Sequence, residues 1–142
     1  MFLSQNELKT VADKAIIVLI TDMDEEIVDQ VIAESIDLMS SYLSRYYDVQ
    51  NIFNKQGAAR NLTVLKYLKD IVIYEVYMRH TRQINEAAQK RYNEAMNFLE
   101  KLNTGDFFIS TLPSIPGEIT SPNNQEEQLT RFGSNSPYQT MY

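Results

Sequence analysis

Residues 61–78 of the chain, NLTVLKYLKDIVIYEVYM, decide its fold class. The leucines and most of the valines and isoleucines in this stretch recur at steps of three and four residues, which is the period of one helix face. Tyrosines and further aliphatic residues occupy much of the remaining circumference. A helix that is apolar on most sides lies at the centre of its domain or is shared with a partner. We therefore predict a core helix over residues 61–80, capped by Asn61.

Two long helices are predicted on either side of this core helix. The first spans residues 25–46, with Asp22 or Asp24 as its cap, because acidic residues at its start meet the positive end of the helix dipole. The second spans residues 84–103 and ends at Gly105, since glycine adopts the left-handed conformation of a helix C-cap without steric cost.

The remaining parts of the N-terminal region are shorter. Ser4 and Glu7 have the spacing of a capping box, which predicts a short first helix. Residues 15–20, AIIVLI, fit either a buried strand or a buried helical turn, and we favour the helix. Residues 47–60 are polar and predict a loop. The resulting fold class is all-α, a small bundle of four to five helices.

The chain after the last helix has a different character. Residues 106–112, DFFISTL, predict a short extended segment, a strand that must pair with another element. All four prolines lie beyond Leu112, so we divide the chain into a helical domain, residues 1–112, and an extended C-terminal arm, residues 113–142. The arm has too few apolar residues to build a core of its own.

Several apolar side chains after the last helix are candidate partner-binding residues. An extended peptide binds through anchors that enter a groove or lie along a sheet edge of a partner, and tethering lowers the affinity that each anchor must provide. The candidates in the extended segment and in the arm are Phe107, Phe108, Ile109, Leu129, Phe132, Tyr138 and Tyr142.

Charged residues supply a second set of candidates. Arg79, Arg82, Lys90 and Arg91 form the only basic cluster in the sequence. We interpret Arg79, Arg82 and Arg91 as groups that pair with acids such as Asp29 and Glu34 across a subunit boundary. A solvated helix face is an equally good interpretation of the same pattern.

Composition excludes several classes of function. The 142 residues carry 19 acidic and 13 basic side chains, a formal charge of −6, which disfavours non-specific phosphate binding. No cysteine is present, so disulfides and thiolate sites are excluded.

His80 is the only histidine, and no nucleophile motif, metal cage or phosphate loop accompanies it. We expect no enzyme activity, no catalytic or metal site and no cofactor. No stretch predicts a secretion signal or membrane span.

Three stretches taken together resemble one known family. They are LITD at 19–22, followed by an acidic helix ending in YLSRY at 42–46; DIVIY at 70–74; and RYNEAMNFL at 91–99, closed by Gly105. In this order and spacing, the chain resembles the Mu-like phage family of small helical neck proteins over residues 2–112. Family members place a Pro-rich turn where this chain has YDVQN, residues 47–51, and the arm has no counterpart in the resemblance.

The resemblance implies a head–tail connector, or adaptor, in the neck of the virion, made in the host cytoplasm. Such a protein forms a homo-oligomeric ring, commonly a dodecamer, that binds the portal protein and downstream neck or tail proteins. DNA would pass through the ring without specific binding, and the negative net charge suits such a channel. We expect no membrane partner.

Two other functions remain open at this point. One is a different neck or tail-completion protein, such as a stopper or tail terminator, which would be richer in strands. The other is a small helical regulator that binds nucleic acid or a host protein. Strand content and salt-dependent DNA binding distinguish these alternatives from the adaptor.

Overall fold

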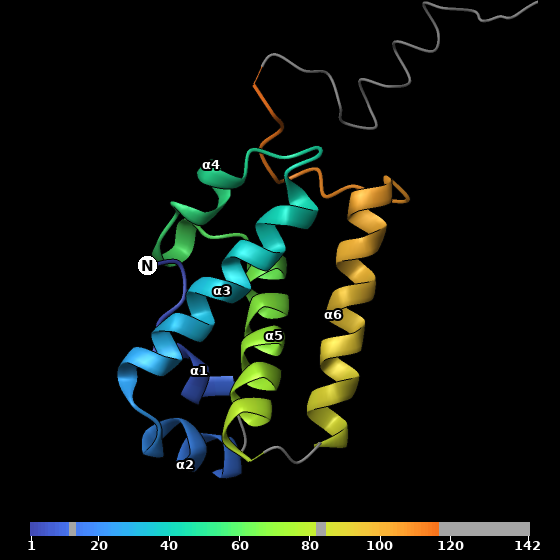
Figure 1. Cartoon of the computed structure of the whole chain (residues 1–142). Helices are drawn as coiled ribbons and strands as arrows, with labels where there is room; N and C mark the ends of the chain where they lie inside the picture. Colours follow the sequence, from blue (N-terminus) through green and yellow to red (C-terminus); the bar gives the residue numbers. More distant parts are fainter. Residues whose placement is uncertain (12–13, 82–84, 117–142) are drawn as a thin grey trace, which may run out of the picture.

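The computed structural model describes residues 1–11, 14–81 and 85–116, which form helices joined by turns (Figure 1). The α-helices are α1 (Gln5–Val11), α2 (Lys14–Asp22), α3 (Glu25–Leu43), α4 (Val49–Phe53), α5 (Leu62–His80) and α6 (Glu86–Thr104), and Gly57–Ala59 forms one turn of 3₁₀-helix. These described ranges contain no strand and only one isolated β-bridge. The predicted all-α class is confirmed. No described helix has the length and apolar character that a membrane span requires.

Helix α5 is the centre of the fold, as its sequence predicts. It packs against α2, α3 and α6, and α6 runs antiparallel to it (Figure 1). The α5 side chains that are fully buried are Val64, Leu68, Ile71, Val72 and Val76. Most of the apolar circumference of α5 is therefore covered within one chain, and its composition does not by itself require a second subunit. Leu62, which is 74% exposed, is the exception.

The helix boundaries follow the capping residues. Asn61 accepts hydrogen bonds from the backbone N–H groups of Thr63 and Val64, at 3.0 and 3.1 Å, and so begins α5. Gly105 ends α6 in the left-handed conformation at φ 83°. At the start of α1, the Glu7 carboxylate accepts from the Ser4 N–H at 3.0 Å, one half of the predicted capping box. Asp24 occupies the N-cap position of α3, although its side chain makes no capping hydrogen bond.

Residues 15–20 are helical, which confirms the favoured alternative, and lie in α2. Two other local predictions need correction. The predicted loop over residues 47–60 instead contains α4 and the 3₁₀ turn, because the Asp48 side chain accepts from the Asn51 N–H and caps a short helix whose Ile52 is buried. Helix α3 ends at Leu43 rather than near residue 46.

The strand predicted over residues 106–112 does not form. This stretch is made of bends and turns, and the isolated bridge joins Ser114 to Tyr47 just beyond it. Its aromatic side chains pack within the chain, Phe108 on Tyr46 just after α3 and Phe107 on Phe98 of α6, so the segment needs no strand partner. Leu112 is buried in the core.

Candidate interaction surfaces

Hydrogen bonds from its backbone and from one side chain hold the segment after α6, residues 106–116, against the helical body. The Ile109 N–H donates to the Tyr47 hydroxyl at 3.0 Å, and the Asp48 N–H donates to the Pro113 carbonyl at 2.9 Å. The Asn61 side chain donates to the Thr111 hydroxyl at 2.9 Å. Burial raises the pKa of Tyr47, as expected for a hydroxyl enclosed by this segment. These contacts fix where the chain leaves the helical body.

The candidate partner-binding residues of this segment pack within the chain. Phe108 meets Tyr46 edge to face with ring centroids 5.2 Å apart, and Phe107 lies 5.3 Å from Phe98. Ile109 is half-buried, whereas Phe107 remains 36% exposed. Of the three, Phe107 is the residue with most surface left for a partner. The candidates Leu129, Phe132, Tyr138 and Tyr142 lie outside the described residues.

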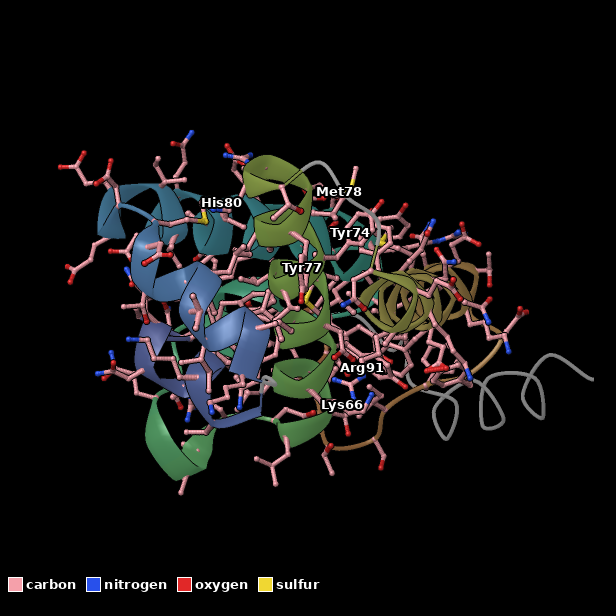
Figure 2. The ribbon with its side chains drawn as sticks, turned by 90° about the horizontal axis from the view of Figure 1, so that it is seen from below. Lys66, Tyr74, Tyr77, Met78, His80 and Arg91 are labelled. Carbon is pink, nitrogen blue, oxygen red and sulfur yellow. The ribbon has the colours of Figure 1, made fainter. Side chains whose placement is uncertain are left out.

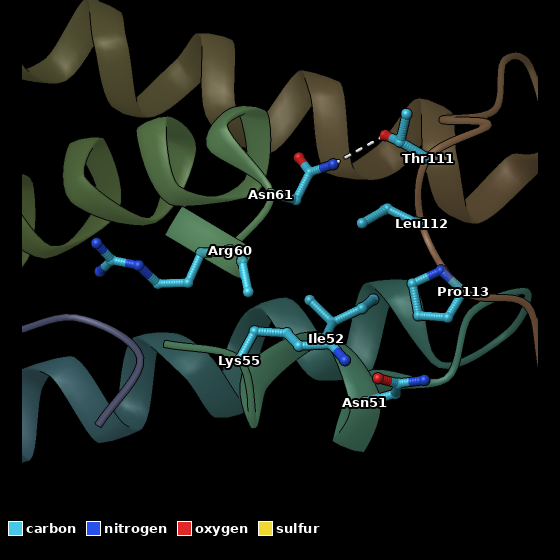
Figure 3. A pocket seen from close by; sticks show the side chains of 9 residues that line it. Asn51, Ile52, Lys55, Arg60, Asn61, Thr111, Leu112 and Pro113 are labelled. Atoms are coloured by element: carbon cyan, nitrogen blue, oxygen red, sulfur yellow. Dashed lines mark hydrogen bonds between the residues drawn. The ribbon is translucent and has the colours of Figure 1, made fainter. Parts of the chain in front are cut away.

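A recess of about 240 Å³ lies where residues 111–113 cross between α4 and the start of α5 (Figure 3). Asn51, Ile52, Lys55 and Leu112 are among the side chains that line it. It is small and combines aliphatic and polar groups, and it adjoins the point from which the arm continues.

An ion pair beneath this recess joins the N-terminus to the body. The Arg60 guanidinium contacts the Glu7 carboxylate at 2.6 Å and also donates to the carbonyl oxygens of Phe2 and Gly57, at 2.7 and 2.8 Å. The pKa of Glu7 is lowered from 4.5 to about 2, chiefly by the hydrogen bond that Arg60 donates to its carboxylate. Burial acts in the opposite direction, with a smaller effect on the pKa. The Arg60 side chain is only 12% exposed. Its role is structural, because its donors are directed at the chain itself.

A larger groove lies between α5 and α6. We name it the α5–α6 groove, and it has a volume of about 600 Å³. Leu62, Lys66 and Lys69 line it from α5, and Arg91 and Glu94 line it from α6. Figure 2 shows Lys66 and Arg91 close together beside α5.

Asp70, one of only two buried polar or charged residues among the described ones, lies in this groove. Burial raises the pKa of Asp70, and the charges of Lys66 and Arg91 oppose that rise. Lys66 Nζ lies 3.3 Å from an Asp70 carboxylate oxygen. A buried carboxylate is stabilised in its charged form by nearby cations, so Asp70 holds Lys66 at the groove through an ion pair, while Arg91 acts on it only through its charge.

Of the charged residues predicted to pair across a subunit boundary, Arg79, Glu34 and Asp29 make contacts within this chain. Arg79 forms its ion pair with Glu34 of the same chain. Asp29 accepts a hydrogen bond from the Gln5 side chain at 3.1 Å, also within the chain. Arg91 lies in the α5–α6 groove, so it does not share a surface recess with Arg79. Arg82 lies outside the described residues.

Tyrosines account for much of the contact between α5 and α6. Tyr74 stacks on Tyr92 with ring centroids 4.0 Å apart, and Tyr67 stacks on Phe98 at 4.2 Å. Burial raises the pKa of Tyr92, with smaller contributions from neighbouring groups. These rings stabilise the helix pair inside one chain.

His80 is exposed and lines a shallow recess at the α2–α3 corner together with Asp22, Asp24 and Arg79. Among the described residues, no group of three or more His, Asp or Glu side chains is arranged to hold a metal ion.

Sequence patterns did not single out the α5–α6 groove, although a signal was present. Lys66, Lys69 and Asp70 are spaced by three and four residues within an otherwise apolar helix, which places them on one face. The Arg60–Glu7 pair had no comparable signal, because its partners are far apart in the sequence.

The described residues thus define a small all-α protein whose surface features are grooves and recesses suited to macromolecular contacts. Residues 2–127 match the family model described as Bacteriophage Mu, Gp36, and the chain belongs to this family. No curated protein and no solved structure matches the chain.

The match confirms the resemblance to a Mu-like phage family and extends it. It continues to residue 127, whereas the resemblance from sequence stretches ended at Leu112. The prediction that the arm has no counterpart in the family is therefore wrong for residues 113–127.

Proposed function

We propose that this protein is a structural component of the phage virion, a subunit of a head–tail adaptor ring that lies between portal and tail and performs no catalysis. The observation that carries the proposal is the match of residues 2–127 to a phage Mu protein family. Membership of that family favours a structural or morphogenesis role in a phage. The adaptor ring, its portal and tail partners and its place in the neck are the further steps that we propose.

Features of the chain support a structural role. The described residues form a helical body in which two of the longest helices, α5 and α6, are held together by stacked aromatic rings. A body of this kind offers fixed surfaces for heterologous contacts, in which one face of a subunit meets a different face of the next and rotation closes a ring. The net charge of −6 would keep the ring from adhering to DNA that moves through it.

The arm is the element that we propose to join the subunit to its partners. Its own apolar residues are too few for an independent core, and its exit from the body is fixed by the hydrogen bond between Asp48 and Pro113. Phe107, the exposed aromatic residue closest to that exit in the chain, extends the same surface. The contacts of Pro113 and Ser114 with the body place the informative truncation after Pro116 rather than after Leu112.

The experiment compares the full chain with the chain truncated after Pro116. Both are tested for binding to the portal protein of the same phage, with native mass spectrometry for ring formation. We expect the full chain to assemble with the portal, and the truncated chain to remain folded by circular dichroism but fail to assemble. Normal assembly of the truncated chain would refute the role of the arm.

A second outcome would refute the adaptor itself. If the full chain does not bind the portal but binds DNA with an affinity that falls steeply with salt, the protein is a nucleic-acid-binding regulator.

A further variant, Phe107→Ala in the full chain, tests the surface around Phe107. It should weaken portal binding without unfolding the protein, because the Phe107 ring is partly exposed while its neighbour Phe98 keeps its stacking on Tyr67.

A further inference from the structure

We propose that the α5–α6 groove binds residues 126–129 of the arm of the same chain, Glu-Glu-Gln-Leu, as an intramolecular latch. The latch forms in the free subunit, before the arm binds a partner, so its test does not depend on the ring or on the portal. The groove supplies an exposed leucine and two cations that have no ion-pair partner among the described residues, and residues 126–129 supply the complementary groups.

The groove has an apolar end and a charged centre. Leu62 lies at the apolar end and is 74% exposed, which is unusual for a leucine in a helix whose other leucines are buried. One turn further along α5, Lys66 begins the charged part, which continues to Lys69 and to Arg91 on α6. A ligand that covers the groove must therefore place an apolar side chain and an acidic side chain about one helical turn apart.

The cations of the groove are only partly neutralised. Lys66 is paired with Asp70, but neither Lys69 nor Arg91 forms an ion pair with any residue in the ranges 1–11, 14–81 and 85–116. Glu94 is the other acid that lines the groove. An acidic peptide would therefore give Lys69 and Arg91 the ion-pair partners that the described residues do not provide.

Residues 126–129 have matching chemistry and spacing. Glu127 and Leu129 are two residues apart, so in an extended peptide they point to the same side about 6.6 Å apart. Lys66 and Leu62 are four residues apart on α5, a rise of about 6 Å along the helix. Glu127 can therefore lie against the charged part of the groove, which begins at Lys66 and continues to Lys69 and Arg91, while Leu129 lies against Leu62. Glu126 adds a second negative charge.

The length of the arm favours the groove of the same chain. Thr111, near the exit of the arm, is hydrogen-bonded to Asn61, the residue before Leu62. Pro113 lines the same recess as Asn61, and the eleven residues from Pro116 to Glu127 span at most about 36 Å, which is long enough to return to the start of α5. A tethered segment also acts at an effective concentration of about a millimolar, well above that of arms on other molecules at micromolar protein.

Engineered cysteines test the latch directly, because the natural sequence has none. The full chain carrying Leu62→Cys and Leu129→Cys is oxidised at micromolar protein and analysed by non-reducing electrophoresis. The control carries Val18→Cys in place of Leu62→Cys, since Val18 is also exposed, at 56%, but lies on α2. Circular dichroism verifies that each variant is folded.

We expect Leu62→Cys to form the intramolecular disulfide at least fivefold faster than the Val18→Cys control. Equal rates would overturn the proposal, because they would mean that the arm samples the whole surface. Disulfide-linked dimers as the main product would also overturn it, since the groove would then receive the arm of a second copy.

Charge reversal provides an independent test in the same disulfide assay. Lys69→Glu with Arg91→Glu should reduce the rate of intramolecular disulfide formation several-fold, and adding Glu126→Lys with Glu127→Lys should restore it. A rate that does not respond to either change would overturn the electrostatic part of the latch. Neither outcome depends on portal binding, so the latch and the adaptor role can fail separately.

Discussion

The ion pair between Glu7 and Arg60 is the contact whose loss has the most clearly calculable effect. Glu7→Gln keeps the shape of the side chain and removes its charge. The Arg60 guanidinium, only 12% exposed, would keep the carbonyl oxygens of Phe2 and Gly57 as acceptors but lose its carboxylate. The N-terminal residues Phe2 and Leu3, which are buried in the core, depend on this connection.

The magnitude follows from the pKa of Glu7. A pKa lowered from 4.5 to about 2 corresponds to roughly 3 kcal/mol of preference for the ionised form in the folded state. The Glu7 side chain is 32% exposed, so solvent screening reduces the usable part, and we expect a loss of about 1–2 kcal/mol at neutral pH. Because the folded-state pKa is the lower one, this stabilisation is present above about pH 4.5 and disappears as the pH falls toward 2.

Urea denaturation at pH 7 and at pH 3 measures both effects. At pH 7 the Glu7→Gln protein should unfold at lower urea than the natural protein, and the difference should narrow at pH 3. The matched control is Glu34→Gln, whose pair with Arg79 is exposed and should contribute only about 0–1 kcal/mol. An equal free energy of unfolding for the natural and Glu7→Gln proteins at pH 7 would refute the reasoning.

Other substitutions test the caps and the contacts of the C-terminal segment. Asn61→Ala removes a helix cap with two backbone donors and should cost about 1 kcal/mol in chemical denaturation. Tyr47→Phe leaves a backbone N–H without its acceptor, so the free energy of unfolding should fall by about 1–2 kcal/mol and that amide should exchange faster with solvent. Gly105→Ala should lower the free energy of unfolding more than Gly57→Ala does. Both glycines have positive φ, but a Cβ at Gly105 would lie 3.1 Å from the Tyr46 hydroxyl, whereas no described atom lies within 4 Å of a Cβ at Gly57. Equal costs for the two glycines would show that the Tyr46 contact relaxes freely.

The long helices could be predicted because their signals are local. The core helix is marked by the apolar period of residues 61–78 and by the Asn61 cap, and the last helix by Gly105. The short helix α4 was missed because its five residues are too few for a periodic pattern, and its stability depends on the burial of Ile52 by other elements.

The prediction of a strand over residues 106–112 failed for a related reason. The residues from Phe107 to Leu112 have the composition of a strand, but Tyr46, Tyr47 and Asn61 offer them partners that only the folded body brings together. The ion pair of Arg79 with Glu34 likewise depends on how α3 crosses α5, which no sequence pattern specified.

The central proposal is that this phage protein is an adaptor in the virion neck, and electron cryo-microscopy of the virion tests it most directly. We expect the helical body to fit a ring of density between portal and tail, with continuous density leading from Pro116 toward a neighbouring protein. Finding the protein in no part of the purified virion would contradict the account.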